Sequence, residues 1–343
     1  MMRLPLFEFR APLSVSEAVL ILDGEGRQAM PLAGGTDLLP NMKRRQQVPK
    51  TLMSLNRIAE LRQARLSDSG SRLGACLTLS EIAADPRFRN GMGALAQAAS
   101  FVATPQIRNM ATLGGNLCLD TRCNYYDQNY EWRKAIGFCL KKDGDTCWVA
   151  PGSSKCMAVS STDTAPALMA LGARVRLVSR SGEREVPLSG LYQNDGIHYM
   201  KREPNELLTE VLLDSLQGWK SAYWKLRRRG SFDFPVLSVA AAAKISESGV
   251  VEDARIVVGS VACLPLAAVE ASSLLKGRTL SQDSIAQAAA LAARIAKPLD
   301  NTDFDMTWRK RVTAEFVAYA LRELRGDDMR GERLLLTRHS SSL

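Results

Sequence analysis

Cysteine is the residue type whose number and placement in this sequence most directly suggest chemistry. There are seven cysteines, and five of them fall between residues 118 and 156. In a reducing compartment, such clustering favours metal binding over disulfide bonds. Four of the five are well spaced, with 15, 7 and 8 residues between successive members: Cys123, Cys139, Cys147 and Cys156.

The spacing of these four thiols does not by itself name a metal. Structural zinc sites usually contain a close C-x2–4-C pair, and none is present here. The common ferredoxin spacings are also missing, so a metal cluster and a set of unligated thiols both stay open. Cys76 and Cys263 lie in apolar runs, as core residues do. Only two histidines occur, which argues against His-ligated metals and His-dependent triads.

Two pairs of adjacent glycines form a second candidate site. One pair lies in the segment 33–37, after an apolar run, and the other lies in the segment 112–116. Adjacent glycines let backbone N–H groups turn toward one centre and let a diphosphate approach closely. A single pair usually marks an ordinary turn, but two pairs with similar flanks favour a dinucleotide site. The side chains that can add hydrogen bonds are those of Thr36, Thr112 and Asn116.

A third glycine motif, in the segment 24–29, superficially fits the Rossmann fingerprint. It follows an expected helix and precedes an expected strand, which is the reverse of what that fingerprint requires. We therefore set it aside. The sequence contains no Walker P-loop and no nucleophile elbow.

The spacing of apolar residues predicts the elements that must position these motifs. Ser14 and Glu17 have capping-box spacing and begin a helix that Gly24 ends. A second capping box joins Thr78 to Glu81. Helices are expected over 14–22, 93–102, 284–296 and 308–324, strands over 29–32, 51–55, 72–77, 174–179 and 254–262, and a strand or buried helix over 236–245.

The cysteine group lies in a stretch, residues 117–160, that breaks this regular pattern and reads as a long inserted loop. Long loops in compact domains are usually functional or disordered, and four well-spaced thiols favour function.

Composition and charge set broader limits. Of the 343 residues, 46% are hydrophobic and 24% are charged, and the formal net charge is +9. No run of 18 apolar residues occurs, so we expect no membrane span and a cytoplasmic protein. Basic clusters at 43–45 and 227–229 fit a solvated surface, a phosphate-bearing cofactor or acidic partner proteins. No zinc finger or RNP-like pattern supports nucleic-acid binding.

Three segments give the chain a family resemblance: AGGTDLLP at 33–40, QIRNMATLGGNL at 106–117 and STDTAPAL at 161–168. The first two resemble the FAD pyrophosphate loops of the flavin-binding subunits of molybdenum hydroxylases. That family includes the medium subunit of carbon monoxide dehydrogenase and the flavin domain of xanthine dehydrogenase. The two glycine loops together are specific, and the resemblance spans nearly the whole chain.

The resemblance implies an α+β fold. A two-part PCMH-type FAD-binding domain is followed by a C-terminal domain of the carbon monoxide dehydrogenase flavoprotein type, with a small antiparallel sheet and helices. The implied ranges are 1–217 for the FAD domain, with subdomains of about 1–57 and 58–217 and an inserted loop of about 118–160, then 218–330 for the C-terminal domain and 331–343 for a tail.

The resemblance also implies which residues contact FAD. The two glycine segments would bracket the diphosphate, Asp163 would hydrogen-bond the ribose or ribityl hydroxyls, and Lys225 would lie near the flavin ring. A cation there would favour reduced, anionic flavin. No catalytic residue is assigned, because substrate chemistry belongs to a partner subunit. The implied cofactor-binding residues are Ala33, Gly34, Gly35, Thr36, Asp37, Thr112, Gly114, Gly115, Asn116, Asp163 and Lys225.

The cysteine group marks a departure from the common family pattern. Most members join the second glycine loop to the Ser-Asp motif by a short connection, whereas 162 − 116 = 46 positions separate Asn116 from Thr162. This insertion is similar to that of the 4-hydroxybenzoyl-CoA reductase branch, in which it binds a [4Fe–4S] cluster. Cys118 is a fifth thiol near enough in sequence to replace a ligand. The implied ligands are Cys123, Cys139, Cys147 and Cys156.

The implied function is electron transfer through FAD and a [4Fe–4S] cluster. The partners would be a molybdopterin-binding large subunit and a small subunit with two [2Fe–2S] clusters, in an (αβγ)2 assembly, with ferredoxin as electron donor. Two alternatives stay open. One is the FAD subunit of an ordinary NAD-linked molybdenum hydroxylase with a zinc-bearing or disordered loop. The other is a non-catalytic assembly protein of the same fold. Neither nucleic acid nor membrane is an expected partner.

Overall fold

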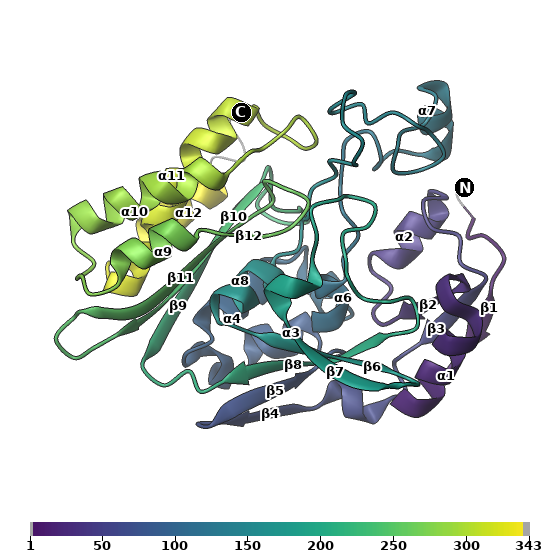
Figure 1. Ribbon diagram of the computed structural model, residues 1–343, viewed down its shortest axis with the longest axis horizontal. Helices are drawn as coiled ribbons and strands as arrows, with labels where there is room; N and C mark the ends of the chain where they lie inside the picture. The colour runs from purple at the N-terminus through teal and green to yellow at the C-terminus, as the bar shows by residue number, and fades with distance from the viewer. Residues whose placement is uncertain (1–2, 339–343) are drawn as a thin grey trace.

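The computed structural model describes residues 3–338. They form three β-sheets, the helices that cover them and the connecting loops (Figure 1). This mixture of helices and small sheets confirms the expected α+β class. The expected domain boundary at 217/218 falls in the turn between the second and third sheets and stays a prediction. No helix in the described part is long and apolar enough to span a membrane.

The first sheet is small and parallel, in the order β1-β3-β2. Helix α1 begins at Ser14, whose hydroxyl accepts a hydrogen bond from Glu17 N at 3.1 Å. The prediction that Gly24 ends this helix is wrong. The helix continues to Glu25, and Gly26 ends it because its φ of +53° suits glycine alone. The bounds are β1 Glu8–Arg10, α1 Val15–Glu25, β2 Ala29–Leu32, α2 Leu38–Lys43 and β3 Thr51–Ser54.

The second sheet has the order β4-β5-β8-β6-β7, and every neighbouring pair is antiparallel. Helices α3, α4 and α8 lie over one face of it (Figure 1). Helix α3 begins with the predicted capping box, in which Thr78 and Glu81 exchange hydrogen bonds. The bounds are β4 Ala64–Ser67, β5 Gly70–Gly74, α3 Leu79–Ala84, α4 Gly93–Phe101, α5 Pro105–Arg108, α6 Leu113–Leu117, α8 Thr164–Ala170, β6 Arg174–Ser179, β7 Gly182–Pro187 and β8 Leu207–Asp214.

The third sheet is antiparallel, in the order β12-β11-β10-β9. In β10, Val239 and Ala241 pack toward α10 and α11, whereas Ala240 and Ala242 join the core beneath α4 and α8. Both faces of the strand are covered, which explains why a mostly apolar stretch fitted a strand or a buried helix equally well. The bounds are β9 Trp219–Leu226, β10 Leu237–Ile245, β11 Val251–Gly259, β12 Leu266–Ala267, α9 Val269–Leu275, α10 Gln282–Ile295, α11 Met306–Arg325 and α12 Arg330–Arg338.

The inserted loop rises from the second-sheet region and carries α7 (Tyr130–Ala135) to a place near α2 (Figure 1). Arg133, which is 1% exposed, donates from Nη2 to the Arg44 carbonyl at 2.8 Å, just after α2. On the other side, Asn301 Nδ2 donates to the Met157 carbonyl at 2.6 Å. The loop is therefore packed between the N-terminal and C-terminal parts of the chain. Four 3-10 helices complete the described elements: Gly26–Gln28, Ala59–Arg62, Pro86–Arg89 and Leu188–Leu191.

Candidate functional site

A cavity of about 590 Å³ lies where the two glycine segments meet the inserted loop. It is formed by parts of the chain that are distant in sequence, since residues from 30 to 234 contribute to its wall. Of the eleven residues expected to contact FAD, Lys225 alone is absent from that wall. Their contacts with FAD stay a prediction. The ten that line the cavity are Ala33, Gly34, Gly35, Thr36, Asp37, Thr112, Gly114, Gly115, Asn116 and Asp163.

The first glycine segment presents unpaired backbone donors beside this cavity. Within residues 3–338, the N–H groups of residues 34–37 donate to no other group of the protein. Unpaired N–H groups of this kind can bind an anionic diphosphate. The charged side chains do not make the wall basic, because its aspartates slightly outnumber its arginines. These are Arg44, Arg122, Arg202 and Arg229 against Asp37, Asp120, Asp127, Asp163 and Asp233.

The second glycine segment is hydrogen-bonded internally and to its surroundings. Gly114 N donates to the Ala75 carbonyl at 2.8 Å. The expected donation from Asn116 to the diphosphate stays a prediction, and its Oδ1 atom accepts three hydrogen bonds from within the protein. They come from Thr162 Oγ1 at 2.8 Å, Thr164 N at 3.0 Å and Thr164 Oγ1 at 2.7 Å. Asn116 therefore ties together the two ends of the inserted loop.

Close packing also explains why two of these positions are occupied by glycine. A Cβ atom on Gly34 would overlap the carbonyl oxygen of Met110. A Cβ atom on Gly114 would lie 2.7 Å from the Cβ of Ala75, closer than real Cβ atoms approach. The expectation that these glycines serve ligand approach is therefore incomplete, because each also lets two backbone segments touch.

Asp163 and Lys225 form a buried ion pair at the edge of the cavity. Lys225 Nζ lies 3.0 Å from Asp163 Oδ1, and the two side chains are 1% and 3% exposed. The same ammonium group donates to the carbonyls of Phe101 and Asp233, and the Tyr223 hydroxyl donates to Asp163 Oδ1 at 2.7 Å. Burial lowers the pKa of Lys225, and the Asp163 carboxylate opposes that change. Lys225 therefore lies behind the cavity wall and contacts it through Asp163 and Asp233.

Sequence reasoning missed Arg122, which closes the cavity from the inserted loop. Its guanidinium pairs with Asp37 of the first glycine segment and lies 2.9 Å from Asp127. It also lies 4.6 Å from the ring centroid of Phe234, another residue of the cavity wall. The only available signal was its position next to Cys123, because Asp37 and Phe234 are far away in sequence.

The four expected cluster ligands are all buried and free of disulfides. Cys123, Cys139 and Cys156 share one apolar cluster, to which Tyr126 also belongs. Cys147 is close enough to Cys156 to affect its ionisation. The inserted loop therefore folds back so that widely spaced thiols become neighbours.

Cys118 and Cys263 lie in surroundings other than those expected from the sequence. Cys118, a candidate substitute ligand, packs against the core of the second sheet and lines the nucleotide cavity. Cys263, expected as an ordinary core residue, lies beside the thiol group and contacts the Cys156 carbonyl at 3.4 Å. Nothing in the local pattern around Cys263 could have revealed this contact between distant segments.

Two of the four thiols, Cys123 and Cys156, are held in the neutral form by burial in the absence of a metal. Burial raises the pKa of Cys123 to about 12 and that of Cys156 to about 11. Among the described residues, no three His, Cys, Asp or Glu side chains converge tightly enough to hold a single metal ion. The thiols thus form a buried cluster but not a preformed site for one ion.

Comparison with known proteins decides the family. The model for the FAD binding domain in molybdopterin dehydrogenase matches residues 5–213, and that for the CO dehydrogenase flavoprotein C-terminal domain matches residues 221–324. The chain belongs to the FAD-binding subunits of the molybdenum hydroxylase family.

Curated relatives and solved structures agree with this assignment. The chain is 30% identical to the carbon monoxide dehydrogenase medium chain of Hydrogenophaga pseudoflava, over 92% of this chain and 96% of that one. It is 32% identical to the aldehyde oxidoreductase FAD-binding subunit of Escherichia coli, over 84% and 90%. The structure of the Hydrogenophaga pseudoflava carbon monoxide dehydrogenase superposes with a TM-score of 0.77 at 28% identity, covering 94% of this chain and 98% of that one.

As a molybdenum hydroxylase FAD-binding subunit, this chain is part of an oxidoreductase and carries a domain for FAD. Most of the cavity wall lies in the part that matches the FAD-binding model, including both glycine segments. Arg229, Phe232 and Phe234 come instead from the part that matches the C-terminal model. The C-terminal domain therefore helps to enclose the nucleotide cavity.

Proposed function

We propose that this chain is the FAD- and [4Fe–4S]-containing electron-transfer subunit of a molybdenum enzyme of the 4-hydroxybenzoyl-CoA reductase type. The observation that carries the proposal is the group of four buried, free thiols next to the nucleotide cavity. Four thiolates around a four-iron core stand farther apart than four thiolates around one ion, so the lack of a single-ion site agrees with a cluster.

Each part of the chain has a defined task in this proposal. The N–H groups of residues 34–37 bind the diphosphate, the Asp163 carboxylate accepts hydrogen bonds from sugar or ribityl hydroxyls, and the four cysteines bind the cluster. Bound FAD supplies electron transfer in one- or two-electron steps, and the cluster supplies single-electron transfer. The inserted loop excludes water from the thiols, which are all less than 9% exposed.

The substrate reaction takes place on another subunit. Two electrons and two protons convert 4-hydroxybenzoyl-CoA into benzoyl-CoA and water, and two molecules of reduced ferredoxin supply the electrons. The named relatives are a medium chain and an FAD-binding subunit, so we expect this chain to assemble in the same way. The partners are a molybdopterin-binding large subunit and a small subunit with two [2Fe–2S] clusters, in an (αβγ)2 complex in the cytoplasm.

The test is to measure iron, acid-labile sulfide and FAD in purified Cys139→Ala. We expect this variant to lose the iron of the [4Fe–4S] cluster and to keep its FAD, because Cys139 lies in the thiol cluster and not on the cavity wall. Cys118→Ala is the matched control, since Cys118 packs against a different core. It should keep its iron. Unchanged iron in Cys139→Ala, or wild-type chain without iron, would refute the cluster.

A second candidate function is the FAD subunit of an ordinary NAD-linked molybdenum hydroxylase. Two relatives favour a dehydrogenase over a reductase, because their names describe dehydrogenases of carbon monoxide and nicotinate. Metal analysis separates the two candidates: iron with acid-labile sulfide supports the reductase, and zinc in the inserted loop supports the hydroxylase. A flavin absorption spectrum in the purified protein argues against a non-catalytic assembly protein.

A further inference from the structure

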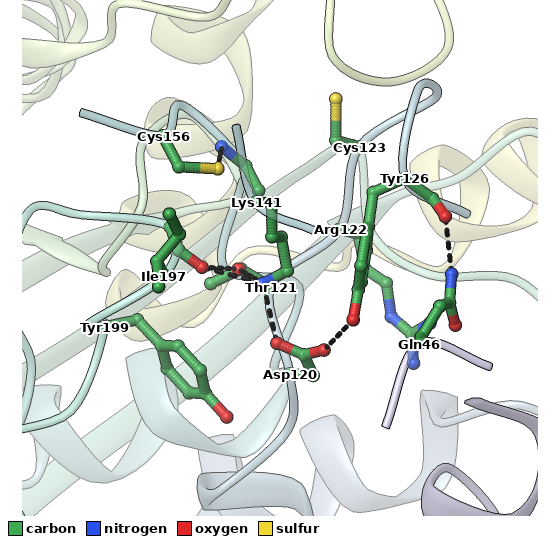
Figure 2. A network of polar contacts seen from close by, with 12 residues as sticks. Gln46, Asp120, Thr121, Arg122, Cys123, Tyr126, Lys141, Cys156, Ile197 and Tyr199 are labelled. Carbon is green, nitrogen blue, oxygen red and sulfur yellow. Dashed lines mark hydrogen bonds and ion pairs between the residues drawn. The ribbon is translucent and has the colours of Figure 1, made fainter. Parts of the chain in front are cut away.

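A buried ion pair lies between the nucleotide cavity and the thiol group. Lys141 Nζ is 2.7 Å from Asp120 Oδ1, and the two side chains are 6% and 7% exposed. The ammonium group also donates to Thr121 Oγ1 at 2.5 Å and to the Gly196 carbonyl at 2.7 Å. Asp120 belongs to the cavity wall and accepts from the Tyr126 hydroxyl at 3.1 Å. Figure 2 shows Lys141 between Asp120 and Cys156.

The other end of this network touches the thiols. Gly196, which accepts from Lys141, also donates from its N–H group to the Cys156 carbonyl at 2.8 Å. A Cβ atom on Gly196 would lie 2.7 Å from Cys156 Sγ, so the backbone at Gly196 is in close contact with that sulfur. Lys141 therefore donates to the same residue whose backbone packs against the Cys156 sulfur.

Stability does not account for placing a charged pair at this position. Burying two charges costs several kcal/mol of solvation per ion, and an apolar pair of similar volume is often as stabilising. The rings of Tyr126 and Tyr199 lie with centroids 4.7 and 5.6 Å from Lys141 Nζ and keep water away. With little water present, the field of the ammonium group is weakly screened. The fixed positive charge of Lys141 can therefore act on charges that form at the neighbouring thiols.

We propose that Lys141 is a positioning residue that raises the reduction potential of the group held by the four thiolates, and that Asp120 moderates this effect as its counter-ion. This inference rests on the proposed function. Reduction adds one negative charge to the thiolate-bound group, and a nearby cation stabilises that charge. Because Asp120 also lines the nucleotide cavity, the pair connects the electrostatics of the two cofactor sites.

The experiment is a redox titration of the [4Fe–4S] EPR signal, resolved from those of the two [2Fe–2S] clusters, in the complete enzyme complex. Lys141→Met should lower the potential by about 59 mV, which is a tenfold change in a one-electron equilibrium. Asp120→Asn should raise the potential, because the ammonium charge loses its counter-ion. Lys141→Arg should keep the wild-type potential. Lys142→Met is the matched control: it removes a neighbouring charge that is 35% exposed and paired with Asp143, and should leave the potential unchanged.

The outcomes separate this inference from the function on which it rests. The role of Lys141 is overturned if Lys141→Met keeps its wild-type iron content and its potential does not change. It is also overturned if Lys141→Met and Asp120→Asn shift the potential in the same direction. Either result leaves the assignment of the cluster intact. If Lys141→Met loses the [4Fe–4S] iron, Asp120→Asn and Lys141→Arg decide: a raised potential in the first and a wild-type potential in the second support the inference, and any other pair of results overturns it. A wild-type complex that contains the [2Fe–2S] clusters of its small subunit but no [4Fe–4S] cluster removes both proposals.

Discussion

The two glycine segments look alike in sequence and differ in structure. In residues 34–37, no N–H group has a partner within the described part of the chain. In residues 113–116, every N–H group has one: Leu113 donates to Leu77 O, Gly114 to Ala75 O, Gly115 to Thr112 Oγ1 and Asn116 to Thr112 O. The first segment is therefore free to bind a ligand, whereas the second is part of the framework.

The difference shows that adjacent glycines alone do not identify a phosphate-binding loop. What decides is whether their N–H groups already have partners, and those partners come from distant residues. The second segment lines the cavity as well, and Gly34 packs against the Met110 carbonyl just before it. We expect substitutions in the second segment to destabilise the fold, and substitutions in the first to affect mainly FAD affinity.

The largest effect is expected for Gly114→Val. A branched side chain would be forced against Ala75, whose Cβ is already 2.7 Å from the position of a single added Cβ. Overpacking of this kind costs about 3 kcal/mol. We expect a lower melting temperature and a loss of FAD in the same variant. Gly190→Ala, at a position with open space around it, is the control and should behave as wild type. A normal melting temperature in Gly114→Val would contradict the conclusion that the second glycine segment is part of the framework.

A smaller loss of stability is expected for Asn116→Ala. The variant removes the acceptor of three hydrogen bonds and leaves buried donors of Thr162 and Thr164 without it. We expect about 2 kcal/mol of lost unfolding free energy, measured by urea denaturation. Amide exchange should also become faster in the inserted loop. Asn90→Ala, at an exposed position, is the matched control. Equal stabilities of the two variants would mean that Asn116 does not hold the loop.

The smallest effect is expected for Gly35→Ala, in the first segment. Its φ of +71° is unfavourable for alanine by about 1 kcal/mol. The segment should relax away from this conformation and bind FAD about fivefold more weakly, with little change in melting temperature. Titration of the flavin-free protein with FAD gives the affinity. If Gly35→Ala loses stability rather than affinity, the first segment is also part of the framework.

Local patterns predicted elements well where the deciding residues are neighbours in the chain. The capping box of Thr78 and Glu81 is an example. Prediction failed for α1, because a glycine inside a helix is tolerated and Gly26, not Gly24, has the positive φ that ends the helix. The sequence did not decide between a strand and a buried helix for β10. A strand that is covered on both faces lacks the alternation of apolar and polar residues that marks a half-buried strand.

The candidate site was less predictable, because its contacts join distant positions. The residue types that bind nucleotides and metals were visible as glycine pairs and cysteines. The partners of Asp37 and Asp163 were not, since Arg122 and Lys225 lie far along the chain. The place of Cys263 beside the thiol group was hidden for the same reason. Which N–H groups are free, and which charges face each other, follow only from the folded chain.

The bonds that Asn116 makes to Thr162 and Thr164 have an evolutionary consequence. They hold the start and the end of the 118–160 excursion at one point, so its length places little demand on the sheets below. The entropy of closing such a loop grows only slowly with its length. An inserted segment closed in this way can change in length or sequence while the flavoprotein scaffold beneath it keeps its architecture.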